Sequence, residues 1–311
     1  MSDYLKQLQT FDINSLPDLD EVVLGALDLF SSINVPQINF QHWQKSLVLG
    51  SVNAYQAARI IFSNKPAYFG NESNYQSLLE HPGNYNSVVI LSASGGKHAV
   101  EMSELAQKSN LDTYLITSKQ DSLAGEYIPL EKQIIFPTNR EPYTYNVSTY
   151  LGPILASTGE FPAALKDFLE TDLNDNLNVD FSNYTAFTLI VPARFAYVVA
   201  MLRTKFEELF GPMVVGRVFS EEEIKHAKTV VKSKKELFIH LGTSKQDYGY
   251  SENNLYLPLP ETIEYAGMIA VGYYVIGKIQ KALPAYFKDS IVAYTKEVSD
   301  IFKQEIKPIV E

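Results

Sequence analysis

The first half of the chain alternates short apolar runs with segments of helical periodicity. The apolar runs predict strands at 46–49, 67–69, 87–91, 113–117 and 133–136. Helices are expected between and before them, over 19–33, 53–62, 75–79 and 99–110. Uninterrupted apolar runs rich in β-branched residues are typical of parallel strands that are buried on both faces. The alternation therefore predicts a doubly wound α/β unit.

The second half starts the same alternation again. A helical region over 149–169 and a polar stretch over 171–180 lead into it, so we place the domain boundary between 160 and 180. The expected domains are 1–165 and 175–311. Strands are predicted at 187–191, 213–218, 236–241 and 255–257, and helices over 195–210, 221–231, 265–282 and 291–309. The predicted fold class is α/β, with two sandwich domains whose parallel sheets are flanked by helices.

Composition narrows the classes of function. The 311 residues include 26 basic and 36 acidic side chains, a formal charge of −10, and no cysteine. An acidic chain without a long basic run offers little to a nucleic-acid backbone, so no nucleic-acid partner is expected. The lack of cysteine excludes thiolate catalysis, disulfides and cysteine-ligated zinc. Any chemistry must come from oxygen and nitrogen groups.

The sequence also predicts a cytoplasmic protein that does not enter a membrane. The first residues contain no basic region that leads into an apolar one, which is the pattern of a secretory signal. The most apolar segment, 265–277, contains three glycines. It is shorter than the roughly 18 to 20 residues that a membrane span needs. We expect it to be a buried helix.

The most informative segment joins the strand at 87–91 to the helix at 99–110. It contains two hydroxyls, Ser92 and Ser94, then the pair Gly95 and Gly96, and then Lys97. Hydroxyls, closely approachable backbone and the N-terminus of a helix together form a receptor for phosphate, to which Lys97 adds a positive charge. The loop does not fit a Walker A motif or a Rossmann fingerprint. The alternative is an ordinary turn that caps a helix.

Two further strand ends carry hydroxyl groups. Thr117 and Ser122 follow the strand at 113–117, and Gly50 with Ser51 follows the strand at 46–49. Ligands of open α/β sheets bind outside the carboxyl ends of the strands, so these groups could converge on one anion. For each hydroxyl the alternative is again a turn or a cap.

At these residues the chain resembles the sugar isomerase (SIS) domain family. The segment Ser92-Ala-Ser94-Gly95-Gly96 is similar to the family's phosphate loop, and Ile116-Thr117 with Ser122-Leu-Ala124 is similar to its next strand end. Two consecutive units in about 300 residues resemble the bifunctional phosphoglucose/phosphomannose isomerases. The sequence departs from the family where Lys97 replaces the usual threonine and where Gly50-Ser51 replaces a longer glycine-rich loop.

The resemblance implies an aldose–ketose isomerase that interconverts glucose 6-phosphate with fructose 6-phosphate, with mannose 6-phosphate as a second substrate, through a cis-enediolate. It implies a homodimer with the site at the interface, a histidine supplied by the partner chain, and no metal or cofactor. The corresponding residues here are Glu207 as the base, five before Pro212; His226 for ring opening; and Arg140 for stabilising the enediolate. A lysine of the C-terminal helix, Lys303 or Lys307, is also implied.

Several of these roles have alternatives. On the helix 195–210, Glu207 lies about 100° and Glu208 about 200° from Phe206, so we expect Glu208 to be the more exposed and prefer Glu207 as the base. Glu207 could instead pair with Arg203, and His226 could be a polar surface residue. Arg140 could pair with Glu141 or another acid.

Two other functions are compatible with the sequence. The loss of the threonine at Lys97, and of the asparagine that the family has beside the catalytic glutamate, motivates a non-catalytic SIS protein that binds a phosphosugar for regulation. An aminosugar-phosphate isomerase or deaminase is the third possibility.

Overall fold

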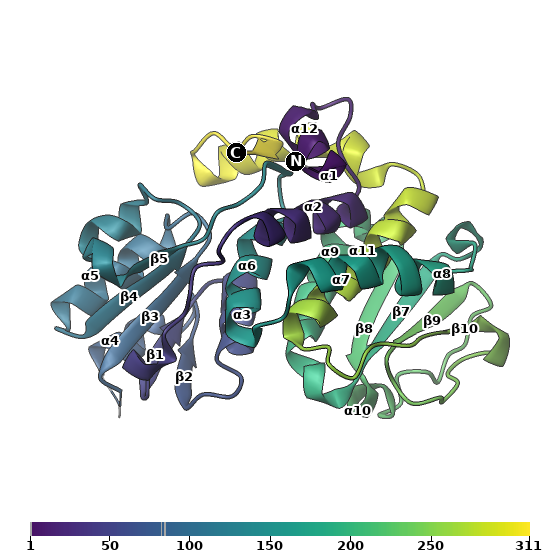
Figure 1. Ribbon diagram of the computed structural model, residues 1–311, viewed down its shortest axis with the longest axis horizontal. Helices are drawn as coiled ribbons and strands as arrows, with labels where there is room; N and C mark the ends of the chain where they lie inside the picture. Colours follow the sequence, from purple (N-terminus) through teal and green to yellow (C-terminus); the bar gives the residue numbers. More distant parts are fainter. Residues whose placement is uncertain (1, 82, 84) are drawn as a thin grey trace. The chain divides into compact units, whose positions relative to one another are not determined.

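The computed structural model describes residues 2–81, 83 and 85–311, and the chain forms two compact units (Figure 1). One unit comprises Ile33–Thr138 and Ser148–Gly159, and we call it the first-sheet unit. The other comprises Met1–Ser32, Asn139–Val147 and Glu160–Glu311, and we call it the second-sheet unit. Each unit is described by itself below.

The first-sheet unit contains a parallel sheet of five strands in the order β2-β1-β3-β4-β5. The strands are β1 (Ser46–Leu49), β2 (Ala67–Gly70), β3 (Ser87–Ser92), β4 (Asp112–Thr117) and β5 (Gln133–Ile135). Its helices are α3 (Asn53–Ile61), α4 (Tyr75–Glu80), α5 (His98–Lys108) and most of α6 (Val147–Thr158). Figure 1 shows α4 and α5 on one side of this sheet and α3 and α6 on the other. The predicted doubly wound unit is confirmed.

Alternation along the strands of this sheet builds its core. Leu47, Val88 and Ile90 share one face and pack in one cluster with Met102 and Ala106 of α5. The intervening residues of the same strands are buried too. A strand that is buried on both faces reads as a continuous apolar run, which is why these strands were recognisable in the sequence.

The second-sheet unit contains a parallel sheet of four strands in the order β10-β9-β7-β8. The strands are β7 (Ala186–Val191), β8 (Val215–Ser220), β9 (Glu236–Leu241) and β10 (Asn254–Leu257). A short antiparallel pair joins β6 (Glu141–Pro142) to β11 (Ile309–Val310). Its helices are α1 (Asp3–Thr10), α2 (Leu19–Ser32), α7 (Pro162–Phe168), α8 (Asn174–Asn176), α9 (Val199–Phe210), α10 (Glu221–Ile224), α11 (Tyr265–Ala282) and α12 (Tyr286–Phe302).

Two predicted helices of the second half were wrong at their ends. The helix expected over 221–231 stops at Ile224 because Ala227 adopts a left-handed backbone with φ of 57°, and His226 therefore lies in a turn. The helix expected over 291–309 is α12, which stops at Phe302 because Lys303 is left-handed. Lys303 and Lys307 thus lie beyond the helix.

The predicted linker differs from the structure, whereas the domain limits stay a prediction. Part of the polar stretch 171–180 is helical, because Leu169 and Leu173, four residues apart, are both buried. The first 32 residues cluster with the second-sheet unit, although we assigned them to a domain over 1–165. The assignment of folding domains to 1–165 and 175–311 stays a prediction.

Helix α11 is buried along nearly its whole length, as expected for the segment 265–277. Among the described residues, no helix is long and apolar enough to cross a membrane. Gly277 lets α11 approach the start of α2 so closely that an added Cβ would overlap the backbone nitrogen of Asp20. Beside this contact, Lys278 pairs with the buried Asp20 at 3.1 Å.

We predict that Gly277→Ala lowers the free energy of unfolding by about 1–3 kcal/mol, because the methyl group would push α2 away from α11. Urea denaturation measures the change. Lys296→Ala, on the exposed side of α12, is the control and should stay within about 0.5 kcal/mol of the wild type. Equal stability of Gly277→Ala and the control would contradict the close contact.

Candidate functional site

The loop between β3 and α5 lies at the point where the strand order of the first sheet reverses. The chain moves from β1 outward to β2, then returns to β3 on the other side of β1 and continues to β4. Ligands of open α/β sheets bind outside the carboxyl ends of the strands at such a switch point. Gly50 and Ser51 follow β1, and Ser92 ends β3. The predicted loop residues therefore occupy the expected position for a ligand site.

Residues after β4 hold this loop in place. The Thr117 hydroxyl and the Ser118 amide donate to the Ala93 carbonyl, both at 3.1 Å, and the Ala124 amide donates to the Gly95 carbonyl at 2.8 Å. Gly95 has φ of 58°, and a Cβ there would overlap Ser122. Thr117 and Ser122 are buried, so in the structure they support the loop. Their predicted role as direct phosphate ligands remains a prediction.

The other polar groups of the loop are more accessible. Ser94 and Lys97 are exposed, and Ser92, Gly96 and Ser51 are half-buried. The Ser92 hydroxyl accepts from the Gly95 amide at 3.2 Å, and within the described part of the chain the Lys97 side chain at the N-cap of α5 makes no capping hydrogen bond. Partial burial lowers the pKa of Lys97. The accessible hydroxyls beside this helix start form a surface that suits a phosphate group.

Backbone strain occurs at the same two strand ends. Val52, before α3, has φ of 48° and ψ of −114°, and Lys97, before α5, has φ of 48° and ψ of −123°. Residues other than glycine rarely adopt this conformation, which costs on the order of 1–3 kcal/mol each. Such strained residues cluster at ligand sites.

The carboxyl end of the second sheet has a comparable loop, but there a glutamate of the same chain accepts the hydrogen bonds that the loop can donate. Here the strand order reverses between β7 and β9, and the loop after β9 contains Thr243 and Ser244. The amide and the hydroxyl of Ser244 both donate to the Glu221 carboxylate at 3.1 Å. In the first sheet, Glu72 accepts from the Val52 amide at 3.4 Å, next to β1. The β3–α5 loop is therefore the better candidate for binding an external anion.

Arg140 lies in the second-sheet unit, on the loop before β6. Its guanidinium donates to the Phe11 carbonyl, lies 4.3 Å from the centre of the Phe11 ring, and is 3.5 Å from the Glu311 carboxylate. The structure therefore shows the pairing with an acid that we considered as the alternative, although the partner is Glu311. Its role in stabilising an enediolate is untested.

Glu207 and Glu208 line a pocket of about 580 Å³ between the end of α9 and α12. The expected order of exposure was wrong: Glu207 is exposed, whereas 21% of the Glu208 side chain is exposed. The expectation took Phe206 as the centre of the buried face of the helix. In the structure, Thr144 and α12 cover the side of α9 that carries Glu208. The remaining lining is largely apolar and aromatic, including Phe210, Met213, Tyr286, Phe287 and Tyr294.

A buried lysine forms an ion pair with Glu208. The Lys205 side chain is 1% exposed, and its ammonium donates to Glu208 Oε2 at 2.6 Å and to the Thr144 carbonyl at 2.5 Å. Burial raises the pKa of Glu208, and the Lys205 charge opposes that rise. We missed this pair in the sequence, although Lys205 interrupts the apolar stripe of Met201, Leu202 and Leu209, which is a signal for a paired buried charge.

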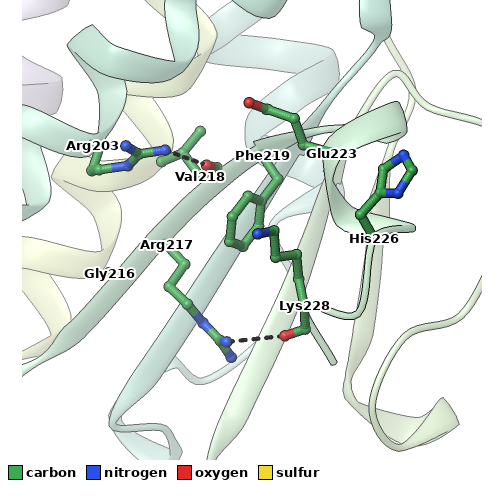
Figure 2. A pocket seen from close by; sticks show the side chains of 8 residues that line it. All are labelled: Arg203, Gly216, Arg217, Val218, Phe219, Glu223, His226 and Lys228. Carbon is green, nitrogen blue, oxygen red and sulfur yellow. Dashed lines mark hydrogen bonds between the residues drawn. The ribbon is translucent and has the colours of Figure 1, made fainter. Parts of the chain in front are cut away.

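His226 lies in a different hollow, of about 520 Å³, beside β8. Arg203, Arg217 and Lys228 also line it (Figure 2). This basic group is not apparent in the sequence, because its members are separated along the chain. The chain therefore places Glu207, His226 and Arg140 at three different positions of one unit. No three histidine or acidic side chains of the described residues gather as a metal site.

The fold is shared with solved structures of low sequence identity. Glucosamine-6-phosphate deaminase from Thermotoga maritima is 15% identical, with 90% of this chain and 94% of that chain covered and a TM-score of 0.60. The C-terminal domain of glucosamine-fructose-6-phosphate aminotransferase from Francisella tularensis is 10% identical, with coverages of 93% and 97% and a TM-score of 0.59. Tagatose-6-phosphate ketose/aldose isomerase from Escherichia coli is 10% identical, with coverages of 92% and 95% and a TM-score of 0.56.

The fold is a tandem pair of SIS-like domains. The predicted fold class is thereby confirmed. No protein-family model and no curated protein sequence matches the chain. At 10–15% identity the similarity shows the shared fold, and the choice of activity and substrate must come from the site.

We predict that Val52→Gly raises the free energy of unfolding by about 1 kcal/mol, because glycine relieves the strain at φ of 48°. Val52 is 64% exposed, so the substitution gives up little apolar burial. Val52→Ala is the matched control, since alanine retains the strain. Urea denaturation of both variants tests the claim, and a glycine variant no more stable than the alanine variant would contradict it.

We predict that Lys205→Met lowers the free energy of unfolding by about 3–5 kcal/mol, because it leaves the Glu208 carboxylate buried without its cation. The double variant Lys205→Met/Glu208→Gln should recover at least half of this loss. Thermal and urea denaturation measure both effects. A single variant within about 1 kcal/mol of the wild type would show that the ion pair is not buried as described.

Proposed function

We propose that the protein is a phosphosugar aldose–ketose isomerase that interconverts glucose 6-phosphate, and mannose 6-phosphate as a second substrate, with fructose 6-phosphate. The observation that carries the proposal is the hydroxyl-rich β3–α5 loop at the switch point of the first sheet, on a tandem SIS-like fold. Solved proteins with this fold include a named ketose/aldose isomerase and a named deaminase, both of 6-phosphosugars.

In this proposal the phosphate binds at Ser92, Ser94 and Gly96, with the start of α5 and Lys97 supplying positive potential. Thr117 and Ser122 hold the loop through the contacts described above. Gly50 and Ser51, after the neighbouring β1, would contact the same ligand. An anion bound here gains from backbone dipoles that are already oriented, so little reorganisation is needed.

The isomerisation itself requires a base that moves one proton. A carboxylate removes the proton from C2 of the open-chain aldose, and the electron pair forms the enediolate. The C2 hydroxyl proton passes to the C1 oxygen, and the carboxylate delivers its proton to C1, which gives the ketose. We assign this step to Glu207, whose exposed carboxylate lines a pocket that a sugar can enter. Glu208 is engaged by Lys205 and is the alternative base.

Ring opening and charge stabilisation are the other steps. We propose that His226 of the partner subunit opens the ring in a homodimer, because His226 and Glu207 line different hollows of the same chain. Arg140 would stabilise the enediolate oxygen. For this role its guanidinium would have to exchange Glu311 for the substrate.

A coupled assay tests the proposal: fructose 6-phosphate is supplied, and glucose 6-phosphate is detected by a dehydrogenase that produces NADPH. Glu207→Gln should lower kcat by about 10²–10⁴-fold with little change in KM, since it removes the base but keeps the shape. Glu208→Gln, the matched control, should change kcat by less than tenfold. The reverse pattern would transfer the role to Glu208 and contradict our assignment.

A non-catalytic binding protein would give a different result. Fructose 6-phosphate would raise the melting temperature without turnover, and Ser94→Ala would abolish the rise. If fructose 6-phosphate gives no turnover and no stabilisation, both the isomerase and the binding protein are contradicted for this sugar.

A second candidate is an aminosugar-phosphate deaminase or isomerase. The Glu207 pocket favours it, because the exposed carboxylate of Glu207 lines this pocket, next to Glu208 with its ion-pair partner Lys205. An ammonium group on the sugar would be attracted there, and nearby aromatic rings also favour cations. Ammonia released from glucosamine 6-phosphate, with no turnover of fructose 6-phosphate, would support this candidate over the isomerase.

A further inference from the structure

The basic hollow beside β8 lies at an open edge of the second sheet. Strand β8 is the last strand of the order β10-β9-β7-β8, and four of its residues line the hollow, namely Gly216, Arg217, Val218 and Phe219. Arg203 of α9 and Lys228, from the turn after α10, complete it with Glu223 and His226. Its volume of about 520 Å³ is in the range of small-molecule sites.

The backbone at this edge is partly occupied by the chain itself. The Val215 amide donates to the Thr185 carbonyl on the β7 side, so the amides and carbonyls of Gly216, Val218 and Ser220 face outward by alternation. Arg203 Nη2 donates to the Val218 carbonyl at 3.2 Å, and the Ser220 amide donates to Glu223 at 2.8 Å. An added strand would have to displace both contacts. The outward amide of the half-buried Gly216 remains as a hydrogen-bond donor, whereas Val218 is buried.

The charges of the hollow favour an anion. Arg203, Arg217 and Lys228 line it against the single carboxylate of Glu223, which is already engaged in capping α10. Arg217 is fixed by the buried Glu236, which also accepts from Thr188 at 2.6 Å. Among the described residues the Lys228 ammonium has no ion-pair partner. This gathering of cations stands out on a chain whose net charge is −10.

An aromatic ring lies among these cations. Figure 2 shows the Phe219 ring between Arg203 on one side and Arg217 with Lys228 on the other. The ring is half-buried, and its inner side packs on Ile190, Ile224 and Phe238. Its remaining surface can support a flat ring by stacking, while the cations hold a phosphate beside it.

We propose that this hollow binds a phosphate monoester with a flat unsaturated body, as in a nucleoside monophosphate. The phosphate is held by Arg203 and Lys228, and the base lies against Phe219. The proposal does not rest on the isomerase function, whose phosphate we place on the β3–α5 loop of the other unit. None of the variants below changes His226.

Isothermal titration with adenosine 5′-monophosphate tests the site. Lys228→Ala should weaken binding by about tenfold or more, because it removes one charge-assisted hydrogen bond. The matched control is Lys232→Ala, which removes the same charge from an exposed position outside the hollow and should change the affinity by less than twofold. No binding to the wild type, or equal effects of the two variants, would overturn the proposal.

Two comparisons separate this site from the phosphosugar site. Ser94→Ala should leave the binding of adenosine 5′-monophosphate unchanged, and a loss there would assign the nucleotide to the β3–α5 loop and overturn the proposal. Inorganic phosphate and adenosine should each bind at least tenfold more weakly than the nucleotide. If inorganic phosphate binds as tightly, the role of Phe219 is excluded. Isomerase turnover, measured separately, decides the function proposed above whatever the titration gives.

Discussion

The parallel pairing of β1 with β3 is the constraint on which the candidate site depends. Because β2 lies on the far side of β1 and β4 on the far side of β3, α3 and α5 leave the strand ends toward opposite faces of the sheet. The two loops at this point are therefore not covered by a crossover helix of their own. The strained backbone of Val52 and Lys97 occurs at the start of these helices, where the chain turns most sharply. Sheet topology thus places the hydroxyls of Ser51, Ser92 and Ser94 at one edge.

The two sheets share the same topology, but their equivalent loops differ in their hydrogen-bond partners. In the second sheet the equivalent loop donates to Glu221, so its hydrogen-bond donors are satisfied within the chain. In the first sheet the hydroxyls of Ser92 and Ser94 accept from the amides of Gly95 and Gly96 within the loop, and among the described residues the N-cap side chain of α5 makes no capping hydrogen bond. An anion supplied from outside can take the place that Glu221 takes in the second sheet. This difference, more than the fold, is the reason we propose the β3–α5 loop as the binding site.

Much of this architecture was predictable, because strands buried on both faces form continuous apolar runs. The segments at 46–49, 87–91 and 236–241 became strands with nearly those bounds. The candidate phosphate loop was recognisable for a similar reason, since its residues are consecutive and lie between two clear elements. Exposure on α9 was misjudged, because the burial of Lys205 and Glu208 depends on Thr144 and α12, which are far away in the sequence. The turn at His226 depends on the left-handed backbone of Ala227, which alanine rarely adopts.

The central claim is that an external phosphosugar binds at the β3–α5 loop. Hydrogen–deuterium exchange with and without saturating fructose 6-phosphate tests it most directly, because it locates the bound ligand without requiring turnover. We expect slower exchange of amides over residues 92–100, with the loop over 242–246 unchanged because Glu221 occupies it. Unchanged exchange over 92–100, whether or not other segments are protected, would contradict the claim.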